Sequence, residues 1–360
     1  MKRKVLSMLL AASLAASVCA CGSSGGSASS ETSAAPAETE GTEEDTSDDS
    51  AAAATATEGD SYTINVASSF AAEGPMQEIM EGFKANIESE TGGRIQVVLH
   101  PSGALGSVKE IAEGLKAGTI EMGAIALEDC DYYCPEYSIL EAPYLFKDQD
   151  HFKRVLDEHG DQLFSEIEEK TGIRTCTWFY RGARMITANK EIKTPDDLAG
   201  LKFRLPSMPL RIAVFEAFGA SPTVVEFSEL YMALKTGTVD AQENPPETIY
   251  SYKYYEAQKY LILSRHIYTM ARFGASAVWM DTLSQEDQDL IMKAWADARN
   301  EVTEKYPDPD ETYIQKCEEA GMTVVTPENE KFIELAKPAV EKWAAENGAE
   351  DILTLINNTQ

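Results

Sequence analysis

The sequence predicts an α/β protein with a largely parallel sheet, because strand-like and helix-like segments alternate along most of the chain. Residues 62–66 alternate apolar and polar side chains as a half-buried strand does, and residues 95–99 repeat this pattern. Between them, residues 79–87 carry apolar side chains at helical spacing. Gly92-Gly93 marks the end of that helix, since glycine commonly ends helices. Such strand–helix–strand units are typical of parallel sheets.

The same alternation continues through the middle of the chain. The further predicted elements are helix 108–116, strand 120–125, strand 202–205, helix 211–218, helix 229–236 and strand 238–241. The segment Leu115–Glu121 parallels the segment Leu234–Asp240, and each consists of a helix end, a glycine and a strand start. This similarity indicates either two lobes of similar topology or independent use of the same helix-ending chemistry. Ser284 begins a long predicted helix that continues to Tyr306.

The composition is typical of a globular protein, but the charge is strongly acidic. The 360 residues include 31 Lys and Arg against 60 Asp and Glu, which gives a formal net charge of −29. Nucleic-acid binding is not expected, since it needs a basic surface that displaces the counterions of phosphates. Binding to anionic lipid through a basic patch is not expected for the same reason. The length allows roughly two domains.

The first 60 residues differ in composition from the rest. Residues 1–20 combine a basic start with a short apolar stretch, which is the pattern of a signal peptide. The stretch ends at Ala20-Cys21-Gly22, which resembles a bacterial lipobox and implies acylation of Cys21, so that the protein is anchored to the cell membrane outside the cytoplasm. The alternative is an ordinary secretory signal with an incidental cysteine. Residues 21–60 are predicted to form an acidic, disordered linker, because they carry too few apolar side chains to fold.

Motifs for catalysis or metal binding are scarce. The chain has no glycine-rich nucleotide-binding motif and no Gly-x-Ser-x-Gly elbow, so neither a nucleotide cofactor nor a hydrolase mechanism is supported. No histidine lies at zinc-ligand spacing from a cysteine pair, so no metal site is predicted. Cys130 and Cys134 either pair as a disulfide, which export would permit, or stay free. We therefore expect a protein that is not an enzyme and needs no cofactor.

Two polar residues near predicted strand ends are candidates for ligand binding. Arg204 lies near the carboxyl end of a predicted parallel strand, where α/β folds bind ligands. It points away from Phe203 and Leu205, and its guanidinium presents two parallel donors that match a carboxylate. The alternative is a surface ion pair in this acidic chain. Asn244 follows the predicted strand 238–241 and either donates to the same ligand or acts as a helix N-cap before a proline.

Five segments together form a distinctive set: LAGLKFRL (198–205), GASPT (219–223), FSELYMALKTGTVDAQENP (227–245), TGGR (91–94) and PSGALG (101–106). This set resembles one protein family, the substrate-binding proteins of tripartite ATP-independent periplasmic (TRAP) transporters. C4-dicarboxylate and sialic-acid binding proteins typify this family. The resemblance covers residues 62–350.

The resemblance implies that Arg204 pairs with the carboxylate of an organic-acid ligand. The other implied ligand contacts are Arg184, Asn244, Phe227 and, from the loop after the first strand, Ser69, Phe70 or Glu73. For Arg184 and Phe227 the alternatives are a solvated charge and a core aromatic residue. The ligand is a dicarboxylate, a keto acid, a uronate or another sugar acid, and the sequence leaves this choice open.

The resemblance also implies a two-lobed periplasmic-binding-protein fold of the type II kind, with a hinge cleft and a long bracing helix. The expected first lobe consists of residues 61–181 and 270–309, and the second of residues 182–269 and 310–360. The implied function is to capture the acid and deliver it to the small and large membrane subunits of a TRAP permease. The alternatives are a ligand sensor of the same fold and, less favoured, a secreted hydrolase.

Overall fold

The computed structural model describes residues 59–360, so the predicted signal peptide, Cys21 and all but the last two residues of the predicted linker lie outside the described residues. The first half alternates strands and helices as the sequence predicts. Its elements are β1 (Tyr62–Ser68), α1 (Pro75–Glu90), β2 (Ile95–His100), α2 (Val108–Ala117), β3 (Met122–Ile125), α3 (Cys130–Tyr133), the 3-10 helix η1 (Pro135–Glu141), α4 (Gln149–Thr171) and β4 (Ile173–Ala188).

The second half repeats this alternation and ends in helices. Its elements are η2 (Pro195–Leu198), β5 (Lys202–Leu205), α5 (Pro209–Ala217), β6 (Ser221–Val224), η3 (Phe227–Glu229), α6 (Leu230–Thr236), β7 (Ala241–Asn244), α7 (Pro246–Ser251), η4 (Tyr254–Glu256), β8 (Tyr260–Ser276), α8 (Ala277–Met280), α9 (Gln285–Lys305), α10 (Pro309–Glu319), β9 (Thr323–Val325), α11 (Asn329–Asn347) and α12 (Glu350–Asn358). The long helix predicted from Ser284 is confirmed as α9, since the Ser284 side chain accepts a hydrogen bond from the Asp287 amide at 3.2 Å.

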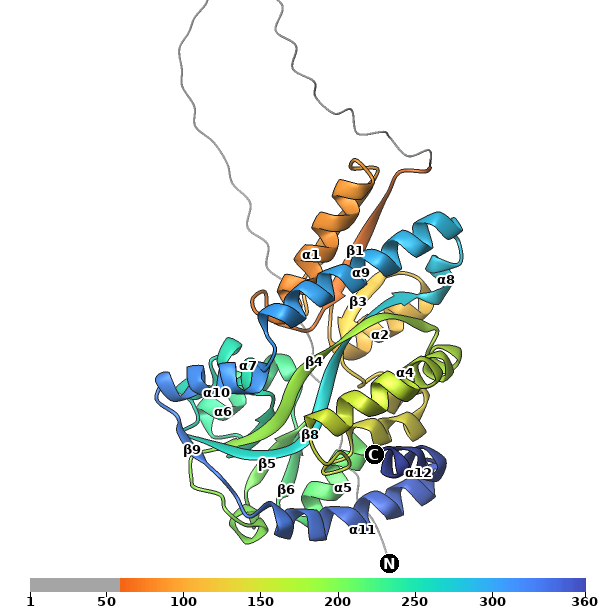
Figure 1. Cartoon of the computed structure of the whole chain (residues 1–360). Helices are drawn as coiled ribbons and strands as arrows, with labels where there is room; N and C mark the ends of the chain where they lie inside the picture. Colours follow the sequence, from red (N-terminus) through yellow and green to blue (C-terminus); the bar gives the residue numbers. More distant parts are fainter. Residues whose placement is uncertain (1–58) are drawn as a thin grey trace, which may run out of the picture. The chain divides into compact units, whose positions relative to one another are not determined.

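One mixed sheet connects both halves in the order β2-β1-β3-β8-β4-β7-β5-β6, with β9 beside β8 (Figure 1). β1 pairs in parallel with β2 and β3, and β5 pairs in parallel with β6 and β7. In each half the earliest strand therefore lies between the other two, and the third lies nearest β4 and β8. Gly118 and Gly237 end α2 and α6 just before these third strands, both in the left-handed conformation that suits glycine (φ 75° and 71°). The shared strand order favours two lobes of similar topology.

The two long antiparallel strands β4 and β8 cross from one half to the other (Figure 1). Their pairing shifts register between Tyr180 and Gly182, so Arg181 lies in a bulge. Asp310, at the start of α10, holds this bulge: it accepts hydrogen bonds from the Ala183 amide (2.9 Å) and from the Tyr180 hydroxyl (3.1 Å). The bulge therefore fixes which way the Arg181 side chain points.

Helices cover the sheet and bury aromatic side chains against it. α9 lies beside α1 (Figure 1), and Phe83 of α1 stacks on Trp295 of α9 with ring centroids 3.9 Å apart. On the other half, Phe332 of α11 packs against Phe218 at 5.2 Å. Burying each of these rings contributes about 1.5–3 kcal/mol to folding. α9 therefore braces the first half, and α11 covers part of the second.

The position of one predicted strand is wrong. The strand predicted at 238–241 lies at Ala241–Asn244 instead, since Asp240 turns back and its side chain accepts from the Lys202 amide at 2.9 Å.

Cys130 and Cys134 are both buried free thiols, not a disulfide. Among residues 59–360, no helix is long and apolar enough to cross a membrane, and no group of three or more His, Cys, Asp and Glu side chains is arranged to hold a metal ion.

Candidate functional site

Arg204 is a buried arginine without an acidic partner. It stands on β5, which is parallel to both of its neighbours, and only 2% of the residue is exposed. Its Nε donates to the Val225 carbonyl at 2.9 Å, and no carboxylate of residues 59–360 forms an ion pair with it. The surface ion pair considered as an alternative is therefore wrong. Burial lowers the pKa of Arg204 to about 10, because the charge has lost water and the attraction of the nearby Glu243 carboxylate compensates this loss only in part.

A cavity that is partly open to solvent lies in front of Arg204. Six of the seven side chains predicted to contact a ligand line it: Ser69, Phe70, Arg184, Arg204, Phe227 and Asn244. The seventh, Glu73, is exposed and is not part of its wall. Because the lining residues follow β1 and lie on β4, β5 and β7, the cavity is formed where both halves of the sheet meet.

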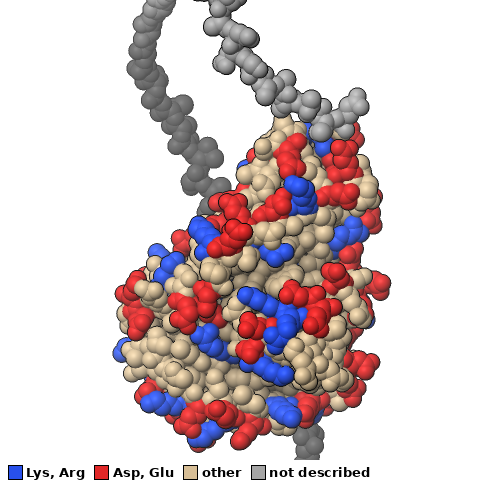
Figure 2. Space-filling model, viewed as in Figure 1, with Lys and Arg blue, Asp and Glu red and all other residues tan. Residues whose placement is uncertain are grey.

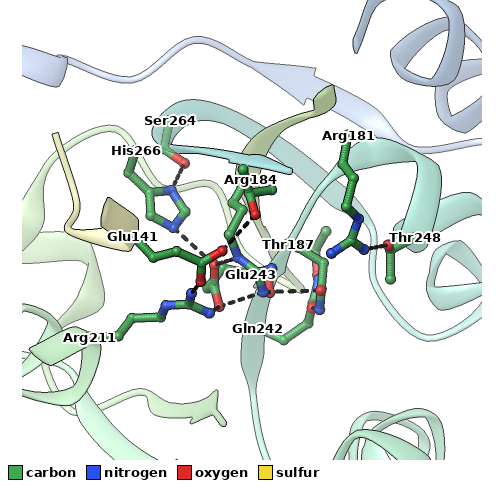
Figure 3. A network of polar contacts seen from close by, with 12 residues as sticks. Glu141, Arg181, Arg184, Thr187, Arg211, Gln242, Glu243, Thr248, Ser264 and His266 are labelled. Atoms are coloured by element: carbon green, nitrogen blue, oxygen red, sulfur yellow. Dashed lines mark hydrogen bonds and ion pairs between the residues drawn. The ribbon is translucent and has the colours of Figure 1, made fainter. Parts of the chain in front are cut away.

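Arg184 reaches this cavity from β4 while most of its guanidinium is held by an acidic neighbour (Figure 3). Its Nε bonds the Glu243 carboxylate, and its Nη2 donates to Glu243 Oε1 at 2.9 Å. Glu243 also accepts from Arg211 Nη1 at 3.1 Å and lies 3.1 Å from His266 Nε2. Burial alone would raise the pKa of Glu243, but Arg184 and Arg211 hold it well below its ordinary value. Arg184 is thus fixed in place rather than solvated.

Asn244 is the last residue of β7 and is not a helix N-cap, since Pro245 occupies that position of α7. Its Oδ1 accepts from Arg184 Nη2 at 3.0 Å, and its Nδ2 donates to Gln242 Oε1 at 2.6 Å. Gln242 in turn donates to the Thr187 hydroxyl at 2.9 Å (Figure 3). These bonds orient the amide and leave its second Nδ2 hydrogen for another acceptor.

Aromatic side chains also line the cavity. Phe227 begins η3 and meets the ring of Tyr252 edge-on at 4.7 Å. The Tyr252 hydroxyl donates to the Ser69 carbonyl at 2.9 Å, which ties the loop after β1 to the second half of the chain. Phe70 is 6% exposed. Phe227 and Phe70 therefore offer apolar surface to whatever lies against Arg204.

Sequence reasoning missed three charged residues of the cavity wall: Arg181, Glu128 and the exposed Glu226. Arg181 is 5% exposed and donates to Thr248 Oγ1 at 3.0 Å (Figure 3). Its guanidinium carbon lies 4.4 Å from the centre of the Phe70 ring. The Arg-Gly pair at 181–182 was the available signal, because glycine inside a strand often marks a bulge. Glu128 follows β3 and carries no comparable sequence signal.

Comparison with known proteins identifies the family. The profile of bacterial extracellular solute-binding protein family 7 (DctP) matches residues 66–347. The chain belongs to this family. The resemblance drawn from the sequence is thereby confirmed, as is the α/β periplasmic-binding fold.

Curated relatives of this DctP-family chain include proteins named for different acids. The 2,3-diketo-L-gulonate-binding periplasmic protein YiaO of Escherichia coli is 32% identical over 68% of this chain and 75% of its own length. The C4-dicarboxylate-binding periplasmic protein DctP of Rhodobacter capsulatus is 31% identical over 75% of this chain and 83% of its own.

Solved structures with the same fold include TRAP periplasmic solute-binding proteins in complex with sugar acids. One from Roseobacter denitrificans holds L-galactonate and is 30% identical, with a TM-score of 0.74. The similarity covers 81% of this chain and 98% of the length of that protein. One from Sulfitobacter holds β-D-galacturonate, at 26% identity and a TM-score of 0.79, over 82% of this chain and 100% of its own.

Proposed function

We propose that this DctP-family protein captures an organic-acid anion outside the cytoplasm, with the ligand carboxylate paired to Arg204, and delivers it to a TRAP-type membrane permease. The observation that carries the proposal is the buried Arg204 guanidinium, which faces a cavity and has no acidic partner among the described residues. A buried unpaired charge is costly, and a bound carboxylate would offset that cost with two parallel hydrogen bonds.

The other lining residues support this pose. Arg184 and Asn244 adjoin Arg204 on the same wall and would add donors to the carboxylate. Phe227 and Phe70 would cover the carbon skeleton, and Ser69 would contribute a polar contact. Relatives bind a diketo-gulonate, a C4-dicarboxylate or sugar acids according to their names, so the ligand belongs to this range of organic acids.

Capture would involve movement of two lobes about β4 and β8. We assign residues 61–181 and 270–309 to one lobe and residues 182–269 and 310–360 to the other, because the shared strand order places three parallel strands on each side of the crossing pair. A ligand that contacts both lobes binds the closed form more tightly and shifts the population toward it. The lobe boundaries at β4 and β8 can be tested by small-angle scattering with and without ligand.

The assignment of Arg204 is tested by calorimetry with a panel of organic acids. Arg204→Ala should weaken binding by about 100-fold or more, since a buried charge pair loses one partner. Arg204→Lys should weaken it by more than about tenfold, because a point charge cannot replace the guanidinium fork. The matched control is Lys202→Ala, which removes the same charge from the same strand but outside the cavity.

The outcome also has a stability signature. Without ligand, Arg204→Ala should unfold at the same or a higher temperature than the parent protein, because it removes an uncompensated buried charge. Binding that is unchanged in Arg204→Ala would contradict the site assignment.

Mass spectrometry of membrane-extracted protein tests the proposed anchor, for which acylated Cys21 is the expected species. A ligand sensor without transport would bind the same acids but would not support uptake with the permease.

A further inference from the structure

Tyr252 connects two residues of the cavity wall without being part of the wall itself. It follows α7 in the second half, and its hydroxyl donates to the Ser69 carbonyl at 2.9 Å. Ser69 follows β1, which β3, β8 and β4 separate from β7, the strand that leads into α7. Ser69 and Phe227 line the cavity, whereas Tyr252 is not among the described residues of its wall. The hydrogen bond therefore bridges the two halves from outside the cavity.

The Ser69 end of this bridge is fixed to the first half. The Ser68 carbonyl accepts from the Gly103 amide at 2.8 Å. The Phe70 carbonyl accepts from the Ser102 amide, also at 2.8 Å. The carbonyls on both sides of Ser69 thus bond within the first half, while the Ser69 carbonyl between them bonds the second half. Because this loop is held on both sides, its bond to Tyr252 acts on the first half as a body.

The Tyr252 end is fixed to the second half. Its amide donates to the Thr248 carbonyl at 3.0 Å, and its ring meets Phe227 edge-on at 4.7 Å and lies 6.1 Å from the ring of Tyr254. Burial raises the pKa of Tyr252 to about 12, so its hydroxyl remains a donor at neutral pH. Since the two rings pack on each other, the place of Phe227 in the cavity wall depends on the place of Tyr252.

A hydrogen bond between the two halves acts on the two directions of binding differently. The proposed movement of the lobes about β4 and β8 would separate Ser69 from Tyr252, and water would then replace each partner. An entering acid meets the open form, in which this bond is already broken, so the bond contributes little to association. A bound acid leaves only after opening has broken the bond, so the bond slows release.

We propose that Tyr252 is a positioning residue that clasps the two halves around a bound acid and slows its release without contacting it. This inference rests on the proposed function, because it requires an acid in the cavity and lobes that move. It separates two roles: the residues of the cavity wall select the acid, and the bond between Tyr252 and Ser69 determines how long the acid stays.

The test measures association and release by stopped-flow fluorescence of the full chain. The probes are D-galacturonate, L-galactonate, succinate and 2-oxobutyrate, one for each class of acid considered. Tyr252→Phe keeps the ring against Phe227 and removes only the hydroxyl. It should release the probes about three- to tenfold faster, the net contribution of one hydrogen bond, with association changed by less than about twofold. Because Tyr252 lies outside the cavity wall, this factor should be the same for every probe that binds.

The matched control is Tyr255→Phe, which removes a hydroxyl three residues further along the chain. The Tyr255 ring packs against Tyr250 at 5.7 Å and, like Tyr252, is not part of the described cavity wall. This variant should change release by less than about twofold, because no bond between the halves is lost. A merely structural role of Tyr252 would instead lower the unfolding temperature of Tyr252→Phe and leave its release rates unchanged.

The outcomes separate this inference from the proposed function. Unchanged release in folded Tyr252→Phe, or a factor that differs widely between probes, would overturn the clasp while binding that is lost in Arg204→Ala still supports the proposed function. A protein that binds none of the four probes, or whose binding survives Arg204→Ala, would overturn the proposed function and the clasp together.

Discussion

Replacing Glu243 with Gln tests how the buried network behind the cavity supports the fold. Glu243 is fully buried and bonds three partners: Arg184, Arg211 at 3.1 Å and His266 at 3.1 Å. Gln has nearly the same shape but leaves two arginines without their shared anion. Arg211 keeps one acid, Glu141, whose Oε2 lies 2.5 Å from its Nη2. Breaking a buried pair by removing one partner costs about 3–5 kcal/mol, so a loss of about 3 kcal/mol or more is expected.

The measurement is urea unfolding of Glu243→Gln and of a matched surface variant, Asp297→Asn. Asp297 pairs with Lys293 at 2.8 Å on an exposed helix face, with about half of each side chain open to water. Its replacement should cost no more than about 0.5 kcal/mol. A loss below about 1 kcal/mol in Glu243→Gln, comparable to the surface variant, would refute the view that this anion compensates the buried arginines.

Three further changes probe other parts of the structure. Ser107→Ala removes the capping box of α2 and should cost about 1 kcal/mol in urea unfolding. Gly182→Ala should cost roughly 2 kcal/mol or more, because its φ of 109° is unfavourable for alanine and the added methyl would overlap Asp310; an unchanged midpoint would contradict the role of the bulge. Burial lowers the pKa of His266 below 6.5, so below that pH the unfolded chain binds a proton that the folded protein does not, and stability falls as the pH falls. The variant His266→Gln lacks this titrating group. Its loss of unfolding free energy relative to the parent protein should therefore become smaller as the pH falls from 7.5 to 5.5, by up to about 1.4 kcal/mol per pH unit.

The order of elements could be predicted from the sequence because the local signals are strong. Glycines follow predicted helices, Ser284 precedes α9, and strand 202–205 is placed at its observed bounds. The prediction failed at β7, whose residues Ala241–Asn244 read as a polar segment. Their side chains can be buried because they form hydrogen bonds with one another and with Arg184. Hydrogen bonds between distant segments leave no pattern in the local sequence.

The candidate site could be predicted only where chemistry and family resemblance coincided. Arg204 is unusual because it is buried and forms no ion pair with any carboxylate of residues 59–360, and no stretch of sequence reveals this in so acidic a chain. Arg181 points into the cavity because Asp310, 129 positions later, holds the bulge around it. Glu128 is one of 60 acids, and only the fold distinguishes it from a solvated one. These residues acquire their roles from contacts between distant segments.

The net charge makes local recognition necessary. Residues 1–21 hold three bases and no acid, and residues 22–60 hold ten acids and no base, so −22 of the −29 belongs to residues 61–360. Figure 2 shows acidic side chains scattered over one face with Lys and Arg between them, not a basic patch that would steer an anion. Long-range attraction therefore contributes little, and at 0.1 M salt charges are screened beyond about 10 Å. An anion must therefore be recognised inside the cavity, where Arg204 is buried and forms no ion pair with a carboxylate of the described residues. Added salt screens the repulsion between the acidic surface and the anion, so it should raise the association rate of the anion more than it lowers the affinity.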